Sequence, residues 1–154
     1  MLILSIETSC DDTACAVVKI TGKTTPKFEI LSSIISSQIK IHAPFGGVVP
    51  TLAAREHAKN LPVVFKKALR AAKIKIEDID YIAVTHGPGL VIALLVGVHF
   101  ARGLAYAFNK KIIPVNHISG HIFSNWLANP RTERAEQSSY DGNEKVKFPV
   151  LNII

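Results

Sequence analysis

The first third of the chain carries short apolar runs that are separated by polar turn residues. Runs of this length, rich in valine, isoleucine and alanine, are typical of strands joined by tight turns. We therefore expect the fold to begin with a series of antiparallel strands. The three strands are predicted at residues 2–7, 13–20 and 28–36.

From residue 51 onward, the apolar positions recur at helical spacing. Residues 51–73 predict a long amphipathic helix that begins just after Pro50, and Pro62 predicts a kink or a break within it. Strands and helices then alternate. The further predicted elements are a strand at 81–85, a helix at 90–108, a strand at 111–115, and a helix that begins near His117 and ends before Pro130.

The last part of the chain loses this periodicity. Residues 131–145 are rich in Thr, Glu, Gln, Ser and Asn and predict a mobile loop, whereas residues 148–154 predict an apolar strand without a terminating signal. The chain then divides into a lobe at 1–129, a flexible loop at 130–146 and, at 147–154, the first strand of a truncated second part.

This order of elements predicts an α/β fold. Three antiparallel strands followed by right-handed parallel crossovers make a mixed sheet of about five strands with helices packed against it. The arrangement is the ribonuclease H-like module that actin-like ATPases use in duplicate. Because the chain shows no internal repeat, we expect it to hold one of two lobes, with the second copy missing.

Composition supports a single folded domain, and the charge widens the choice of partners. Hydrophobic residues make up 48% of the 154 positions and charged residues 19%, which supplies enough apolar side chains for a core. The net charge of +6 and the pI near 9.4 permit a polyanionic partner such as a nucleic acid. A basic helix face exposed to solvent has the same composition, so the charge alone does not decide.

We expect a cytoplasmic protein with no membrane contact. The apolar run at 91–108 is interrupted by His99 and Arg102, and no basic segment precedes the first apolar run. Cys10 and Cys15 are too few for a disulfide framework, and we expect both to be small buried residues in a reducing compartment.

The pair His117 and His121 carries the clearest chemical signal. A spacing of four on a helix stacks two imidazoles on one face, where one divalent cation can bind both. Iron or zinc accepts such a pair with a third ligand, commonly a carboxylate, and an open position. The alternative is a pair of structural histidines. Protease chemistry of the zincin type is disfavoured because Ile118 stands where the catalytic glutamate would follow.

Two loops supply further candidates. Asp11 and Asp12 follow the first strand and are candidate catalytic residues, because carboxylates there are able to orient a nucleotide-bound magnesium ion or a group of a tRNA substrate. Gly87 and Gly89 precede a helix and are candidate substrate-binding residues, since free amides and the helix dipole suit a phosphate or carboxylate. Both loops are also ordinary turns in composition, and neither matches a Walker or dinucleotide-binding pattern.

Four blocks of sequence together resemble the TsaD family in order and spacing, over nearly the whole chain. The resemblance implies an actin-like fold and the activity of a tRNA N6-adenosine threonylcarbamoyltransferase. That family uses threonylcarbamoyl-AMP to modify an adenosine next to the anticodon. The blocks are Ile6-Glu7-Thr8-Ser9-Cys10-Asp11, the GGVVPTLAAREH stretch at 46–57, Gly87-Pro88-Gly89-Leu90, and His117-x-x-Gly120-His121.

By this resemblance, His117 and His121 are the two histidine ligands of the family's iron or zinc. The family's third ligand is an aspartate of the carboxyl-terminal half, and its Ser-Gly-Gly loop for the acyl-adenylate also lies beyond these residues. We therefore expect the chain by itself to be inactive. Ser119 and Asp12 depart from the family pattern, which usually has glutamate at both positions, and the departure at 119 weakens any role inferred for it.

Two other classes stay open. A TsaB-like paralogue, a non-catalytic partner of the enzyme, shares the fold but lacks the histidine pair. TsaB-like or KEOPS-type proteins would bind an enzyme of this family through the helices predicted at 51–73 and 90–108. An actin-like ATPase or sugar-kinase lobe would carry glycine-rich phosphate contacts after the first strand, where residues 9–12 contain no glycine.

Overall fold

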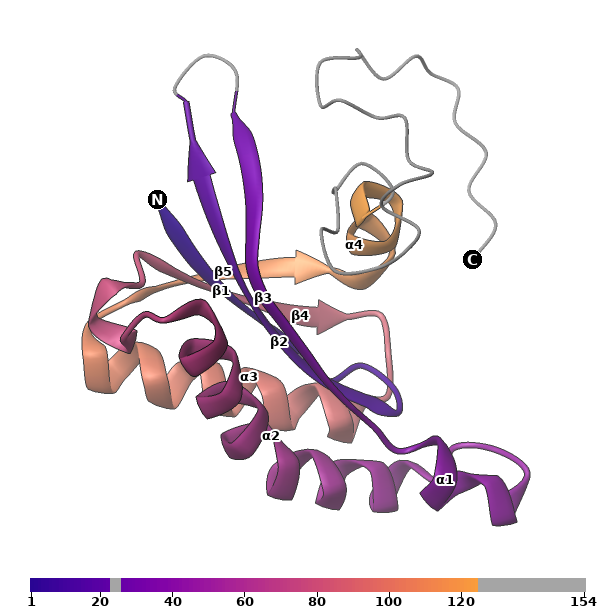
Figure 1. Cartoon of the computed structure of the whole chain (residues 1–154). Helices are drawn as coiled ribbons and strands as arrows, with labels where there is room; N and C mark the ends of the chain where they lie inside the picture. Colours follow the sequence, from indigo (N-terminus) through magenta and orange to yellow (C-terminus); the bar gives the residue numbers. More distant parts are fainter. Residues whose placement is uncertain (23–25, 125–154) are drawn as a thin grey trace.

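A computed structural model describes residues 1–22 and 26–124, and its centre is a five-stranded sheet (Figure 1). The strands lie in the order β3-β2-β1-β4-β5, with β1 in the middle. Each strand forms within two residues of the bounds predicted from the sequence. The bounds are Leu2–Glu7 for β1, Asp12–Thr21 for β2, Lys27–Ser37 for β3, Tyr81–Gly87 for β4 and Lys111–Asn116 for β5.

The sheet is mixed, as the order of elements predicted. The β1 strand pairs antiparallel with β2, which pairs antiparallel with β3, and it pairs parallel with β4 on its other side. A second parallel pair joins β4 to β5. Ile6 shows the central position of β1, because it lies opposite Cys15 on one side and Val84 on the other. The mixed α/β sheet with flanking helices is confirmed.

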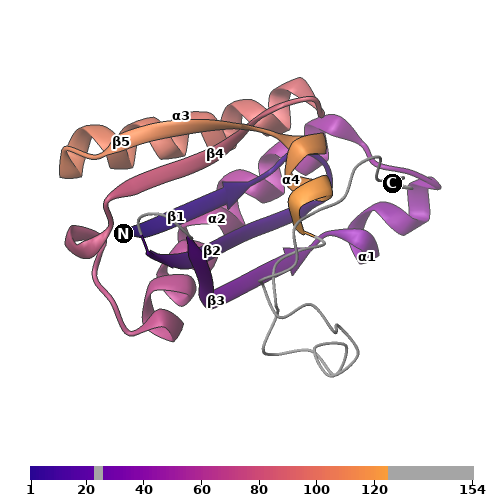
Figure 2. The same cartoon turned by 90° about the horizontal axis from the view of Figure 1, so that it is seen from above.

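Two long helices cover one face of this sheet, α2 at Pro50–Ala72 and α3 at Val91–Phe108 (Figure 2). The buried residues of α2 recur at intervals of three or four, and they pack on strand residues such as Leu4 and Ile82, which are both 0% exposed. The helix runs through Pro62 without interruption, so the predicted break is wrong, although the helix axis bends along its length (Figure 1). The buried residues of α2 are Ala53, His57, Leu61, Val64 and Ala68.

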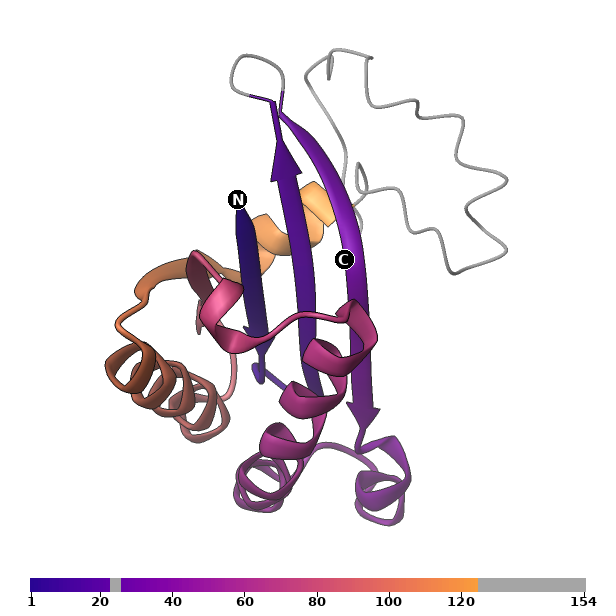
Figure 3. The ribbon, with the colours of Figure 1, turned by 60° about the vertical axis from the view of Figure 1, so that its left-hand side comes forward.

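A short helix on the opposite face of the sheet carries the histidine pair. This helix, α4, spans His117–Ser124 and follows β5 directly, so it begins where the parallel strands end (Figure 3). The predicted start of this helix is confirmed. Its predicted extension toward Pro130 lies outside the described residues, as do the predicted loop at 131–145, the predicted strand at 148–154 and the divisions at 130–146 and 147–154.

Three short elements were not predicted, because segments of three or four residues show no periodicity. The α1 helix at Ile39–His42 and the 3-10 helix η1 at Ala43–Phe45 connect β3 to α2, and the 3-10 helix η2 at Ile76–Asp78 precedes β4. Gly46 ends η1 with a φ of 70°, a backbone conformation that glycine adopts without steric cost.

The apolar helix α3 packs against the sheet and against α2. Phe100 of α3 meets Phe65 of α2 edge to face, with 5.6 Å between ring centroids. By length and composition alone α3 would also be able to cross a membrane, with a mean hydropathy of 1.8. One such helix is weak support for a membrane span, because core helices often have the same composition. Its contacts with β4, β1 and β5 account for its buried residues, whereas only 22% of the helix is buried in the structure.

Candidate functional site

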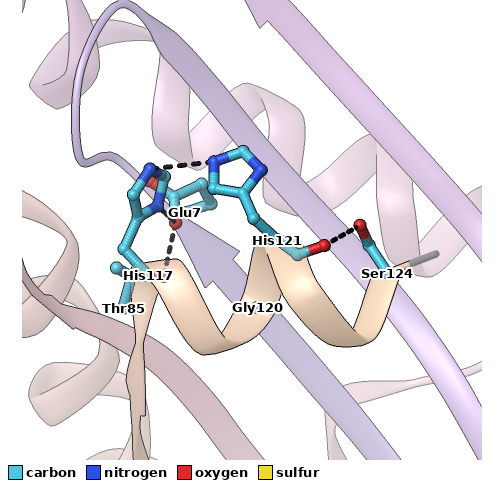
Figure 4. Close-up of a pocket in the computed structure, with 6 residues that line it drawn as sticks. All are labelled: Glu7, Thr85, His117, Gly120, His121 and Ser124. Atoms are coloured by element: carbon cyan, nitrogen blue, oxygen red, sulfur yellow. Dashed lines mark hydrogen bonds and ion pairs between the residues drawn. The ribbon is translucent and has the colours of Figure 1, made fainter. Parts of the chain in front are cut away.

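Side chains from three elements meet at the edge of the sheet where the parallel strands end. Glu7 is the last residue of β1, Thr85 lies near the end of β4, and α4 supplies His117 and His121. Because parallel strands end at the same edge, residues far apart in sequence come together there. The open pocket between them has a volume of about 160 Å³. It is lined by Glu7, Thr85, His117, Gly120, His121 and Ser124 (Figure 4).

The two imidazole rings point toward each other in this pocket (Figure 4). The Nε2 atoms of His117 and His121 are 3.0 Å apart, and the ring centroids are 4.4 Å apart with an interplanar angle of 84°. The side chain of His117 is 25% exposed, and His121 is exposed. The structure therefore places the predicted pair together at the surface of the molecule, with one nitrogen of each ring directed at the other.

This pair fits part of a metal site. Two nitrogens that bind one ion at about 2.0–2.1 Å each lie roughly 3 Å apart, which agrees with the separation of the two Nε2 atoms. Across residues 1–22 and 26–124, no group of three His, Cys, Asp or Glu side chains is arranged to hold a metal. Glu7 approaches His117 at Nδ1, on the other side of the ring. The described residues thus offer two ligands, and a third would have to come from elsewhere.

Glu7 is held in place by donors on both of its oxygens. The backbone amide of Ser9 donates to Oε1, the Thr85 hydroxyl donates to Oε2, and His117 Nδ1 lies 3.4 Å from Oε2. Burial raises the pKa of Glu7, but the hydrogen bonds from Ser9 and Thr85 and the charge of His117 outweigh it, so the net pKa is below the ordinary value. Glu7 is therefore an ionised carboxylate at neutral pH.

An ionised carboxylate next to Nδ1 sets the orientation of the His117 ring. Nδ1 also lies 3.2 Å from the Ser9 hydroxyl, so polar groups surround this nitrogen. A proton on Nδ1, donated toward Glu7, leaves Nε2 unprotonated and facing the pocket. This is the arrangement that carboxylate partners impose on metal-binding histidines. Glu7 was not predicted as a site residue, although an acidic residue at the end of a half-buried central strand is a usable signal.

The other predicted site residues do not line the pocket. The loop with Gly87 and Gly89 packs against the turn after β1, where the Leu90 amide donates to the Ser9 carbonyl over 2.8 Å. A Cβ on Gly89 would lie 2.7 Å from that oxygen, so the close approach of two backbones requires glycine there. This contact gives Gly89 a packing role, and its proposed role in substrate binding stays a prediction.

The acidic turn after β1 lies outside the pocket lining as well. Asp11 and Asp12 are both partly buried, and Asp12 Oδ1 is a buried oxygen that has no hydrogen-bond partner within the described part of the chain. Cys10, between Ser9 and Asp11, is exposed, so the expectation of two buried cysteines is wrong for it. Cys15 is buried, and burial raises the pKa of its thiol to about 12.

Sequence comparisons match the chain to one protein family and to relatives that carry the name of that family. A family described as "TsaD: tRNA N6-adenosine threonylcarbamoyltransferase" matches residues 29–135. A tRNA N6-adenosine threonylcarbamoyltransferase from Thermosipho melanesiensis is 56% identical over 130 residues, which cover 84% of this chain and 38% of the relative. One from Fusobacterium nucleatum is 58% identical over 127 residues, or 82% of this chain and 36% of the relative. The chain thus spans little more than a third of the length of these relatives.

Solved structures confirm the fold class. YeaZ from Pseudomonas aeruginosa superposes with a TM-score of 0.54 at 19% identity, covering 80% of this chain and 46% of that one. RuvC from Thermus thermophilus superposes with a TM-score of 0.53 at 12% identity, covering 97% of this chain and 85% of that one. At these identities the likeness concerns the fold alone, and it agrees with the ribonuclease H-like arrangement of the sheet.

Proposed function

Because the chain belongs to the TsaD family of tRNA N6-adenosine threonylcarbamoyltransferases, we propose that it contributes the amino-terminal lobe of such an enzyme. The enzyme would transfer threonylcarbamoyl from threonylcarbamoyl-AMP to the N6 amine of an adenosine next to the anticodon of tRNA. The observation that carries this proposal is the pair His117 and His121, which faces an open pocket at the end of the parallel strands, within the matched residues.

The reaction is an acyl transfer. The N6 amine attacks the carbamoyl carbon of the donor, a C–N bond forms, the bond from that carbon to the phosphate oxygen breaks, and AMP leaves while the amine loses a proton. Such a reaction depends on positioning the two substrates and on stabilising the charge that develops on oxygen. The basic net charge of +6 suits a tRNA substrate.

We propose that His117 and His121 hold one divalent ion, iron or zinc, and that a third ligand, a carboxylate, lies outside this chain. The ion would polarise an acyl or phosphate oxygen of the donor. The contribution of Glu7 is to hold the His117 ring by its Nδ1 proton, so that Nε2 stays directed at the pocket. The chain alone, with two ligands, is expected to be inactive.

The two loops beside the pocket would act on the substrates. Gly87 ends β4 and Gly89 lies between β4 and the first turn of α3, where free backbone amides suit the phosphate of the donor. We assign Asp11, on the turn that follows β1, and Asp12, the first residue of β2, to orienting a substrate group.

The helices α2 and α3 would bind a protein partner of the TsaB-like or KEOPS type. Several apolar side chains on them are exposed, among them Val63 at 51%, Val91 at 70% and Leu95 at 45%, which is typical of an interaction surface.

A TsaB-like role for this chain itself is the second candidate. The histidine pair argues against this role, because TsaB-like paralogues share the fold of the enzyme but lack the pair. A tRNA substrate also implies a cytoplasmic location.

A single-turnover assay tests the proposed activity. The complete protein that carries this sequence is mixed with tRNA and threonylcarbamoyl-AMP labelled in the threonine, and label on the tRNA is measured. We expect transfer to a tRNA with adenosine next to the anticodon and none to the same tRNA with guanosine there. Replacement of His117 by alanine should abolish transfer. Equal labelling of both tRNAs, or full activity of the variant, would contradict the proposal.

A further inference from the structure

A second group of histidines lies buried beneath the turn that carries the two aspartates. His57 of α2 and Gln38 are 0% exposed, and His42 is 3% exposed. His57 Nε2 lies 3.0 Å from the Cys10 carbonyl oxygen, and its Nδ1 lies 3.3 Å from Gln38 Nε2. Gln38 Oε1 in turn lies 3.0 Å from His42 Nε2. These residues form one continuous hydrogen-bonded chain.

The position of every proton in this hydrogen-bonded network follows from the contacts of His57. A carbonyl oxygen only accepts, so His57 Nε2 must carry the proton that reaches Cys10. In the neutral ring, Nδ1 then accepts, both from the Thr13 hydroxyl at 2.8 Å and from the Gln38 amide nitrogen. The same amide nitrogen donates to the Ala53 carbonyl at 3.4 Å, which leaves Gln38 Oε1 as an acceptor.

The His42 end of the hydrogen-bonded network gives the same donor-to-acceptor direction independently. The backbone amide of Val49 can only donate, and it donates to His42 Nδ1 over 3.3 Å. His42 Nε2 must therefore carry the proton that reaches Gln38 Oε1. Both lines of reasoning assign the same orientation to the Gln38 amide. Two neutral histidines, each protonated on Nε2, thus satisfy every partner in the chain.

This network holds the turn that leads to the candidate acidic residues. His57 donates to the carbonyl of Cys10, and the backbone amide of Gln38 donates to the carbonyl of Asp11 over 2.9 Å. The carbonyl before them, that of Ser9, accepts from the Leu90 amide at the start of α3. Three successive carbonyl groups are thereby held by three different segments of the chain, which leaves the backbone of Asp11 little freedom to rotate.

We infer that His57 and Gln38 are positioning residues, whose function is to hold the turn at residues 9–11, so that Asp11 and the adjoining Asp12 at the start of β2 keep one direction. The importance of the aspartates for transfer rests on the proposed function. The holding of the turn does not, and it is measurable without tRNA or donor. Failure of the inference is therefore distinguishable from failure of the proposed function.

The tautomers of the unmodified chain give the first test. Long-range ¹H–¹⁵N spectra at neutral pH distinguish a histidine protonated on Nε2 from one protonated on Nδ1. We expect His57 and His42 both to show the Nε2-protonated form. A His57 ring protonated on Nδ1 would overturn the inference, since Nε2 would then have no proton to donate to the Cys10 carbonyl.

A matched pair of substitutions gives the second test. His57→Gln places an amide nitrogen near the position of Nε2 and keeps a donor for Cys10, whereas His57→Asn reaches only the position of Nδ1 and loses that donor. The alkylation rate of the Cys10 thiol, mapped by mass spectrometry, reports how firmly the turn is held, because Cys10 is exposed and Cys15 is buried.

The two variants should differ in this rate. We expect the Asn variant to react about fivefold faster than the unmodified chain, the factor that corresponds to one ordinary hydrogen bond, and the Gln variant to stay near the unmodified rate. Equal rates in the two variants would show that His57 only fills space in the core, and the inference would be wrong.

Discussion

Acidification should destabilise this fold through His57. Burial lowers the pKa of the imidazole below its ordinary value of 6.5, although nearby carboxylates and the Cys10 carbonyl pull it upward. In the unfolded chain the same ring titrates near 6.5, so below that pH the unfolded state binds a proton that the folded state does not. Stability is therefore retained above pH 6.5 and is lost as the pH falls below it.

The size of the effect has an upper bound. For one proton, the free energy of unfolding falls by at most about 1.4 kcal/mol per pH unit. Between about pH 7.5 and about pH 5, a His57 ring that stays neutral in the fold would thus cost about 2 kcal/mol. Small domains have a total stability of roughly 5–15 kcal/mol, so the loss is large enough to measure.

Urea unfolding at several pH values, followed by circular dichroism, measures this loss. The His57→Gln variant is the control, because it removes the titrating ring and keeps a polar side chain at the site. Glu7 does not interfere, since its pKa lies below the ordinary value of 4.5 and outside the window. We expect a steeper loss in the unmodified chain than in the variant. Parallel losses of stability in the two proteins would show that the ionisation of His57 does not destabilise the fold.

Three further predictions follow from single contacts. Glu7→Gln should weaken zinc binding by the chain roughly 10–100-fold, measured by calorimetry, because the His117 ring loses its ionised partner; unchanged affinity would exclude that role. Gly97→Ala should destabilise the fold by about 1–3 kcal/mol in thermal unfolding, because its Cβ would lie 2.5 Å from the buried hydroxyl of Thr8. The control is Gly103→Ala on the same helix, where a Cβ meets open space; this change should stabilise the fold by up to about 1 kcal/mol. Iodoacetamide near pH 8 should modify Cys10 and leave Cys15 intact in the folded chain, because the raised pKa of about 12 keeps the buried thiol protonated; modification of both would contradict its burial.

The strands and long helices were predictable because their signals are local. Alternating apolar residues and turn residues define β1 to β5, and the three-to-four spacing of buried positions defines α2. The elements that escaped prediction were short, such as α1 with four residues. The predicted break of α2 at Pro62 did not occur, because packing against the sheet decides whether a proline breaks a helix.

The site was predictable only in part, for the same physical reason. The spacing of His117 and His121 brings their rings together within one helix, so sequence alone is sufficient. The contact between Glu7 and His117 joins residues 110 positions apart, and it exists only because β1 and β4 are parallel neighbours and β5 leads directly into α4. The contact between His57 and the Cys10 carbonyl spans 47 positions and depends in the same way on how α2 packs.

His117 and His121 are proposed to bind one divalent ion together through their Nε2 atoms. The direct measurement is an NMR titration of the ¹⁵N-labelled chain with Zn²⁺, followed through the imidazole nitrogens. We expect the Nε2 signals of both rings to shift together, and His117→Ala or His121→Ala to abolish the shift in the remaining ring. Replacement of the exposed His99 by alanine should change nothing. Zinc binding that persists unchanged in His117→Ala, or shifts confined to other histidines, would contradict this proposal.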